Sequence, residues 1–234
     1  MQSLNDNSWI HLSAQDARYT LPAAGLAAAA DCGWVEQMLP FIETYSANGQ
    51  VVLDPFCGWG TTMLAAGLLG RSGIGVEIDL TRVEAARRRL AHHGIDAQII
   101  HGNSTALPFY DKSIDVCLTS VPYFGPWFGD QKQQTNADSG QCYAQRNYET
   151  YLRLLDRIFE EVARVLRPGA FFIAMVENLR VDGHFLPLAW DCARQLERYF
   201  VLGDERILTY TKDSLSGRSL TSNRAHEYAL ICRK

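Results

Sequence analysis

Short runs of apolar and β-branched residues alternate with longer segments of helical periodicity along most of the chain. This pattern predicts strands at residues 51–54, 97–101, 114–120 and 170–176, and one strand within residues 72–79. It predicts helices at residues 34–45, 61–69, 80–92, 151–166 and 186–199. Such alternation is typical of a parallel sheet covered by helices. Two further strands, at 201–210 and 227–232, are expected to form a closing antiparallel hairpin.

The sequence therefore predicts one α/β domain of the Rossmann-like type. We expect a seven-stranded, mostly parallel sheet with helices on both faces and a C-terminal antiparallel hairpin. The domain is expected to span residues 34–234, preceded by a polar, acidic segment at 1–33. Arg167-Pro168-Gly169 is expected to end the fourth helix. Residues 124–148 interrupt the pattern and exceed the usual loop length, which indicates a substrate-contacting loop or a lid.

Composition narrows the class of protein. The chain has 234 residues, of which 47% are apolar, enough for a sizeable core. Its net charge of −4 disfavours a generic nucleic-acid binder, although the excess of acids lies within residues 1–50, where Arg18 is the one basic residue. The longest apolar run, at 21–30, is half of the roughly 20 residues that span a bilayer, and the first fifteen residues show no signal pattern. We expect a cytoplasmic protein.

Cysteines and histidines give no metal-binding pattern. The six cysteines lie at positions 32, 57, 117, 142, 192 and 232, and no two are within four positions of each other. This spacing excludes paired zinc or redox motifs, and no HExxH is present. Four cysteines (57, 117, 192 and 232) fall in apolar or helical runs, so buried thiols are expected.

A glycine-rich string, DPFCGWGTT at residues 54–62, lies between the first predicted strand and its helix. Ligands of such sheets bind beyond the carboxyl ends of the strands, and the start of a helix offers free N–H groups. No lysine is present, so a Walker A phosphate loop is disfavoured. Glu77 ends the next strand, at a spacing from Asp54 that suits binding of ribose hydroxyls. An amino-acid-bearing nucleoside fits better than a dinucleotide, and an ordinary glycine turn with a surface acid is the alternative.

A second string, SVPYFG at residues 120–125, follows the strand predicted at 114–120. The parallel topology places it beside the glycine-rich string. Together with GRSGIGVEID, these strings resemble the motifs of S-adenosylmethionine-dependent DNA amino-methyltransferases of the cytosine-N4 and adenine-N6 type. The segments YLRLLDRIFEEVARVLRPGAFF and HEYALICRK are also similar to that family.

The resemblance implies S-adenosylmethionine as the cofactor, and it implies that residues 1–33 cover the cofactor site. The cofactor-binding residues that it implies are Asp54, Phe56, Cys57, Gly58, Gly60, Thr61, Glu77 and Asn103. Asn103, expected at the adenine amino group, has a turn-forming role as its alternative. Trp59 departs from the small residues usual at its position.

The resemblance also assigns catalysis to Ser120, Pro122 and Tyr123. The Ser120 hydroxyl and a backbone carbonyl near Pro122 would accept the protons of an exocyclic amino group, which is otherwise a poor nucleophile. Tyr123 would stack on an extruded base. Phe124, Trp127 and Phe128 are candidate substrate contacts. Val121 stands where the family has proline, which leaves a working variant, the favoured interpretation, or a catalytically silent chain.

The implied reaction is methylation of a nucleic-acid base, favouring cytosine N4 or adenine N6 in DNA. Methylation of an RNA base, a silent cofactor-binding partner subunit and a small-molecule N-methyltransferase remain alternatives. No separate target-recognition domain is evident, so a protein partner or a single-stranded or structured target is expected. The arginines of the helix at 80–92 are interpreted as a solvated surface in preference to a phosphate-binding face. They are Arg82, Arg87, Arg88 and Arg89.

Overall fold

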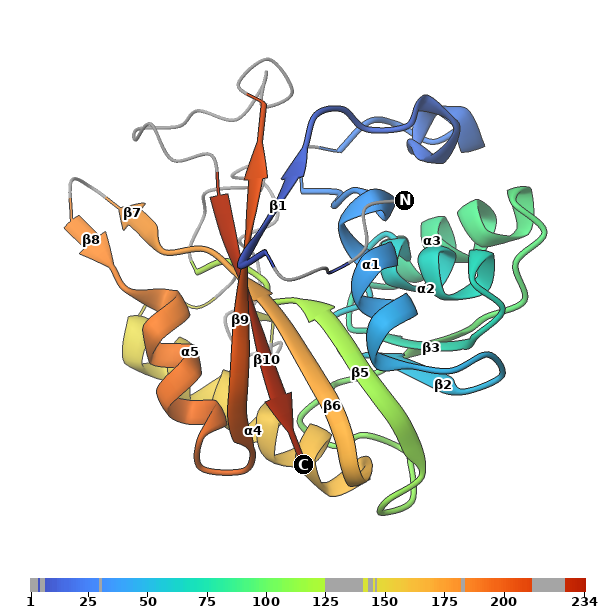
Figure 1. Cartoon of the computed structure of the whole chain (residues 1–234). Coiled ribbons are helices and arrows are strands. Elements are labelled where there is room, and N and C mark those ends of the chain that lie inside the picture. The colour runs from blue at the N-terminus through green and yellow to red at the C-terminus, as the bar shows by residue number, and fades with distance from the viewer. Residues whose placement is uncertain are drawn as a thin grey trace.

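An eight-stranded mixed sheet runs through the middle of the molecule (Figure 1). The computed structural model describes residues 4, 7–29, 31–124, 141–142, 145, 147–181, 184–211 and 226–234. The strand order across the sheet is β1 (Trp9–Leu12), β9 (Val201–Tyr210), β10 (His226–Arg233), β6 (Leu166–Val176), β5 (Ile114–Ser120), β2 (Val51–Asp54), β3 (Ser72–Glu77) and β4 (Gln98–His101). Strand β10 is antiparallel to both of its neighbours, and the other pairs are parallel.

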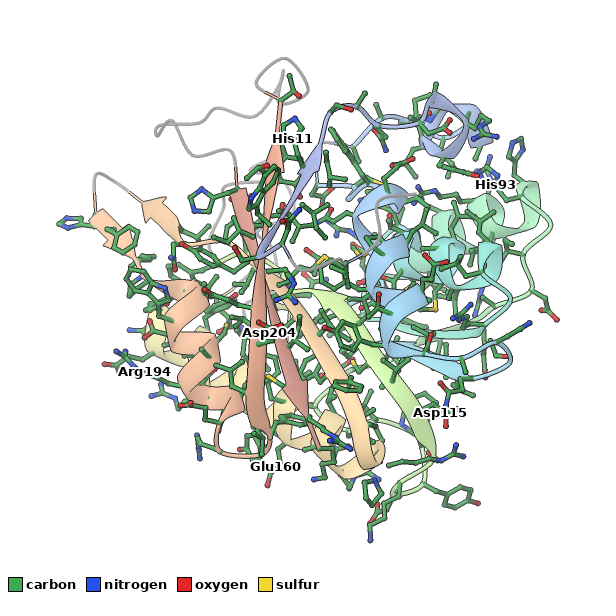
Figure 2. The ribbon with its side chains drawn as sticks, viewed as in Figure 1. His11, His93, Asp115, Glu160, Arg194 and Asp204 are labelled. Carbon is green, nitrogen blue, oxygen red and sulfur yellow. The ribbon has the colours of Figure 1, made fainter. Side chains whose placement is uncertain are left out.

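Helices cover both faces of the sheet, as predicted (Figure 1). Helices α1 (Val35–Tyr45), α2 (Thr61–Leu68) and α3 (Leu80–His92) cover one face, and α4 (Tyr148–Val165) and α5 (Leu188–Leu196) cover the other. Side chains of a strand alternate between faces, so Val52 packs under α1–α3 while Leu53 packs under α4 and α5. Glu160 of α4 and Arg194 of α5 lie on the outer surface (Figure 2). No helix of the described ranges is long and apolar enough to cross a membrane.

The prediction of seven mostly parallel strands is wrong, because the N-terminal segment contributes an eighth strand and the sheet is mixed. Strand β1 pairs in parallel with β9, and its Ile10 and Leu12 side chains are buried in the core on the α1–α3 face of the sheet. His11, on the opposite side of β1, contacts the Thr209 hydroxyl (Figure 2). Four residues are too short to show a periodic pattern, and β1 is stabilised by a partner about 200 positions away. The antiparallel hairpin of β9 and β10 is confirmed.

Helix and strand boundaries differ from the prediction around the fourth helix. Helix α4 begins at Tyr148 because the Asn147 side chain accepts a hydrogen bond from the Thr150 amide. It ends at Val165, and Arg167-Pro168-Gly169 belong to β6 instead of following the helix as a loop. Gly169 donates to the Lys234 carbonyl, which keeps this irregular start on the sheet.

A small hairpin was also missed by the sequence analysis. Strands β7 (Leu179–Val181) and β8 (His184–Leu186) form a separate two-stranded sheet after β6. Helix α5 consequently starts at Leu188, and the Asn178 side chain accepts a hydrogen bond from Ala189 at that start.

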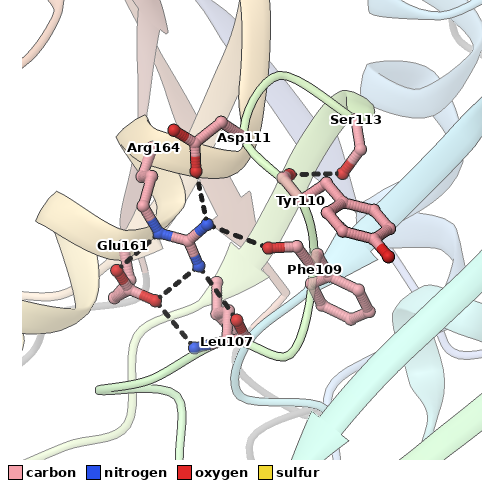
Figure 3. Close-up of polar contacts among 7 residues, drawn as sticks. All are labelled: Leu107, Phe109, Tyr110, Asp111, Ser113, Glu161 and Arg164. Atoms are coloured by element: carbon pink, nitrogen blue, oxygen red, sulfur yellow. Dashed lines mark hydrogen bonds and ion pairs between the residues drawn. The ribbon is translucent and has the colours of Figure 1, made fainter.

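Arg164 fastens α4 to the connection that precedes β5 (Figure 3). Its guanidinium donates to the carbonyls of Leu107 and Phe109, at 2.9 Å each, and forms ion pairs with Asp111 and Glu161. Glu161 accepts in turn from the Leu107 amide at 2.8 Å. These contacts fix the start of β5, the strand that ends at Ser120.

The loop after β2 packs directly on β3 through Cys57, which lies on Gly75. The Cys57 amide donates to the Val76 carbonyl at 3.0 Å, and a Cβ at position 75 would lie 2.8 Å from Cys57 Cβ and closer still to its Sγ. A glycine in β3 is therefore required for the loop to reach the sheet.

Replacing Gly75 by alanine should destabilise the protein by about 1–3 kcal/mol, because the added methyl group overpacks the contact with Cys57. Urea denaturation measures the change. Gly203→Ala in β9 is the matched control, because the nearest atom to its new Cβ is 3.8 Å away. The control should stay within about 0.5 kcal/mol of wild type. Equal effects of the two substitutions would contradict the packing argument.

Candidate active site

The glycine-rich loop is held in a defined shape between β2 and α2. Gly60 has a φ of 79°, the left-handed conformation that glycine adopts most readily, and its amide donates to the Cys57 carbonyl at 2.9 Å. Helix α2 begins at the next residue, Thr61, so its first amides face the end of the loop. The Thr61 hydroxyl donates to the Gly33 carbonyl at 3.2 Å, which connects the loop to the N-terminal segment.

Glu77 at the end of β3 bonds to the loop through its carboxylate. One oxygen accepts from the Gly58 amide at 2.7 Å, and the other accepts from the Asp79 amide at 2.9 Å. The side chain is 9% exposed. The predicted partner of Asp54 thus lies directly beside the loop, and each of its oxygens keeps a lone pair for a ligand.

The turn after β4 also contacts the loop, through a residue that the sequence analysis did not single out. Buried Ser104 donates to the Pro55 carbonyl at 2.6 Å. The neighbouring Asn103 side chain is exposed and accepts from the Thr105 amide at 3.0 Å, which is a turn-forming contact. Ser104 therefore brings the Asn103 turn next to the glycine-rich loop.

The SVPY string leaves the sheet at the end of β5 with its backbone restrained at two points. The Val121 amide donates to the Met175 carbonyl at 2.8 Å, a bond that proline at this position would lack. The Pro122 carbonyl accepts from the hydroxyl of buried Tyr151 in α4 at 2.6 Å. Phe124 packs against Tyr151 and Tyr148, with ring centroids 5.4 Å away in each case.

These two loops line a single pocket. The empty space that it encloses, counted together with the open solvent at its mouth, is about 540 Å³. The pocket is lined by eight of the predicted site residues, which are Asp54, Phe56, Cys57, Gly58, Thr61, Ser120, Pro122 and Tyr123. Gly60, Glu77, Asn103 and Phe124 are not part of this lining. Trp127 and Phe128 lie outside the described residues, as does Tyr143.

Asp54 is a buried carboxyl in the lining of the pocket. Burial raises its pKa to about 6, while hydrogen bonds from Thr119, Thr62 and the Phe56 amide oppose that rise. The Thr119 hydroxyl donates at 2.6 Å, which joins the last residues of β5 to those of β2. The carboxyl thus belongs to the scaffold that sets the distance between the two loops.

The arginines of α3 do not form a uniformly solvated surface, so that prediction is wrong for two of them. Arg89 is completely buried and donates to the carbonyls of Trp59 and Tyr19 and to the Thr61 hydroxyl. Arg82 lines the pocket and forms an ion pair with Asp31. Arg87 and Arg88 are exposed. Sequence periodicity places all four on one helix, but it does not show which of them face a polar loop.

The chain is similar to known proteins over parts of its length. A family model described as DNA methylase matches residues 35–88, the part from α1 to α3 that contains the glycine-rich loop. The tRNA (guanine(10)-N2)-dimethyltransferase of Methanothermobacter thermautotrophicus is 40% identical over 76 residues, 32% of this chain and 22% of that protein. The type II methyltransferase M.MthZI of the same organism is 58% identical over 38 residues, 16% of this chain and 11% of that protein. The chain thus matches less than a quarter of the length of either relative.

A solved SAM-dependent methyltransferase from Methanosarcina mazei has the same fold. Its TM-score to this chain is 0.57, at 18% identity, over 83% of this chain and 97% of that one. The fold is therefore that of the S-adenosylmethionine-dependent methyltransferases. Over these short stretches the chain is similar to a DNA methylase model and to a tRNA methyltransferase.

The raised pKa of Asp54 predicts a pH dependence of stability. The folded state holds this proton up to about pH 6, whereas an unfolded aspartate releases it near pH 4. The contribution of Asp54 to stability is therefore fully present below pH 4 and is lost as the pH rises through 6. Asp54→Asn, measured by urea denaturation, should gain stability relative to wild type between pH 4 and pH 7, by up to about 3 kcal/mol. A difference that does not change with pH would contradict the raised pKa.

Proposed function

We propose that this protein transfers a methyl group from S-adenosylmethionine to the exocyclic amino group of a nucleic-acid base, with cytosine N4 in DNA as the favoured acceptor. The observation that carries the proposal is the pocket lined by both the glycine-rich loop and Ser120-Val121-Pro122-Tyr123. One loop has the composition of a nucleoside site, and the other presents hydrogen-bond acceptors to a second substrate. A methyl donor and an amino group would therefore meet in the same cavity.

The residues of the pocket fit the proposed cofactor. Its wall combines glycine backbone, hydroxyls and the first amides of α2. In the proposal, Glu77 holds the ribose and Asn103 the adenine amino group, while the remaining contacts come from Asp54, Phe56, Cys57, Gly58, Gly60 and Thr61. Residues 1–33 are proposed to cover this site, supported by the presence of Asp31 and Gly33 in the pocket wall.

The cofactor supplies an electrophilic methyl group on a sulfonium, so the protein's task is to make the acceptor nitrogen nucleophilic. The lone pair of an exocyclic amino group is delocalised into the base. Acceptors that bind its protons turn that lone pair out of the ring plane and stabilise the charge developing on nitrogen. The Ser120 hydroxyl is suited to this role because it makes no hydrogen bond with any described residue. The second acceptor is the carbonyl of Val121 or that of Pro122. The Pro122 carbonyl accepts one hydrogen bond from Tyr151, and its second lone pair can accept another.

Tyr123 is proposed to stack on the target base after the base leaves its helix. Its side chain is half-buried and lines the same pocket as Ser120, which puts the ring beside the proposed position of the base. The ring of Phe124, by contrast, is buried against Tyr148 and Tyr151. This packing stabilises the backbone next to Tyr123. Trp127 and Phe128 remain proposed substrate contacts beyond the described residues.

The target polymer is the finer part of the proposal. The serine of the SVPY string favours cytosine N4 over adenine N6 through its resemblance to the amino-methyltransferases. An RNA base is the second candidate, because one of the relatives is a tRNA (guanine(10)-N2)-dimethyltransferase. A net charge of −4 predicts weak binding to duplex phosphates, which favours a single-stranded or structured target or a protein partner that supplies recognition.

A catalytically silent subunit is the weaker alternative. Val121 is the departure that suggests it, since the first proline of the family motif is missing. In the structure the Val121 amide donates to Met175 and its side chain is 1% exposed, so backbone and packing restrain the loop in place of the proline ring. This favours a working variant.

Substitution of Ser120 by alanine tests the proposal. The full chain is incubated with methyl-labelled S-adenosylmethionine and separate pools of DNA and RNA, and the labelled nucleoside is identified after digestion. We expect N4-methylcytosine from DNA, formed about 10- to 100-fold more slowly by the variant, the cost of one hydrogen bond to a developing charge.

Ser72→Ala is the control, because Ser72 is exposed and begins β3, at the end of the strand away from Glu77 and the pocket. It should retain wild-type rates. Label in RNA alone would support the second candidate. No label in either pool, or equal rates for Ser120→Ala and wild type, would contradict the proposed function.

Tyr151→Phe should slow methyl transfer about 3- to 10-fold at unchanged KM for the cofactor, because it removes the bond that orients the Pro122 carbonyl. Tyr148→Phe is the matched control. It removes a similar hydrogen bond, to Asp191 at 2.8 Å, in the same aromatic cluster, and it keeps the ring that packs on Phe124 and the bond to the Pro122 carbonyl. Both variants should lose some thermal stability, and only the first should lose kcat. Equal values of kcat for the two variants would refute a positioning role of Tyr151.

A further inference from the structure

The two edges of the main sheet are protected differently. At the edge formed by β4, the Gly102 amide donates to the Glu77 carbonyl of β3 at 2.9 Å. Alternation along the strand therefore directs the Ile99 carbonyl away from β3, to the outside of the sheet. Arg87 of α3 donates to that carbonyl at 2.6 Å. A charged side chain on an edge carbonyl hinders the addition of another strand.

Strand β1 forms the other edge, and its outward backbone groups make no hydrogen bond with any described residue. Amides of β9 and of the residue after it donate to the Ser8 and Leu12 carbonyls, at 2.9 and 3.2 Å. The even-numbered residues of β1 thus bond to β9, and alternation directs the N–H and C=O groups of Trp9 and His11 outward. Both residues are exposed, Trp9 by 54%.

The composition of this edge suits pairing with an identical strand. Residues 7–14 contain no acid, lysine or arginine, so two copies of the segment would not repel each other. Before β1 begins, the same edge is formed by residues 201–206 of β9, of which Asp204, Glu205 and Arg206 are charged (Asp204 in Figure 2). Charge therefore hinders strand addition beside that part of β9, but not beside β1.

We propose that β1 is a self-association surface, at which two copies of this chain pair their β1 strands in antiparallel fashion about a two-fold axis at Ile10. In this register, Trp9 of each copy lies opposite His11 of the other copy. Because Trp9 and His11 direct their backbone groups outward, each such pair can exchange both of its N–H···O=C hydrogen bonds. Ile10 bonds to β9 and lies opposite the Ile10 of the other copy. The surface is separate from the proposed methyl-transfer site.

The burial pattern of β1 selects this register. Ile10 and Leu12 are buried on the α1–α3 face, whereas Trp9 and His11 lie on the other face. A shift by one residue would bring core-facing side chains opposite outward-facing ones. A shift by two residues would leave part of β1 unpaired. So short a pairing buries less surface than a permanent dimer, and we expect a dissociation constant of about 10 µM.

Sedimentation equilibrium of the full chain, between about 1 and 500 µM, measures the association. The wild-type chain should be monomeric at the low end and dimeric at the high end. Trp9→Lys should raise the dissociation constant about 10-fold, because it removes two aromatic contacts and places two like charges about 8 Å apart. Tyr110→Lys is the matched control, since Tyr110 is 89% exposed and lies in the connection before β5. It should dimerise like wild type.

Ile10→Cys tests the register. The two Cα atoms of a non-hydrogen-bonded antiparallel pair lie about 4.5 Å apart, within the range of a disulfide. With copper phenanthroline as the oxidant that accepts the two electrons, this variant should form covalent dimers. Leu12→Cys is the matched control, because Leu12 is similarly buried on the same face. The register places the two copies of residue 12 roughly 14 Å apart, too far for a disulfide.

Several results would overturn the proposal. They are a wild-type chain that stays monomeric over the whole range, equal dissociation constants for Trp9→Lys and Tyr110→Lys, and covalent dimers formed as readily by Leu12→Cys as by Ile10→Cys. Circular dichroism shows whether each variant keeps its fold. If Trp9→Lys does not fold, the two cysteine variants decide the question, because they report a gain of a covalent product.

Discussion

A buried hydrogen bond, from the Thr119 hydroxyl to the Asp54 carboxylate, connects the two strands that carry the site. It lies one residue before the end of β5 and at the last residue of β2, which are adjacent and parallel in the sheet. Parallel neighbours end at the same edge, and this bond fixes how far each strand runs before its loop begins. The glycine-rich loop and the SVPY loop consequently start from a common rigid point. The pocket, the placement of Ser120 and the support from Tyr151 all depend on that register.

Much of this arrangement follows from local sequence. Strand β5, helix α3 and the hairpin strand β9 have the bounds that their hydrophobic patterns predict. The two loops were recognised because their residue types are unusual over a few consecutive positions, and parallel topology then placed them side by side. Such features are encoded over ten or so residues, where periodicity and turn chemistry dominate.

The remainder depends on contacts between distant residues, and these leave no local signal. Strand β1 is stable only because β9 offers an uncovered edge. Arg89 and Arg88 are neighbours on one helix, yet the first is completely buried and the second exposed, because only Arg89 faces the carbonyls of Tyr19 and Trp59. Tyr151 reads as an ordinary core residue of an amphipathic helix until its hydroxyl is found on the Pro122 carbonyl.

The N-terminal segment is attached to the rest of the molecule at several places along its length. Residues 9–12 pair with β9 at one edge of the sheet, and the Tyr19 carbonyl accepts from Arg89 in the helical layer, at 2.5 Å. Local opening of a segment has a free energy between zero and that of global unfolding. Amide hydrogen exchange along residues 9–29 would follow that local opening. Because Asp31 and Gly33 of this segment line the pocket, the stability of the pocket wall depends on contacts that lie far from the glycine-rich loop in the sequence.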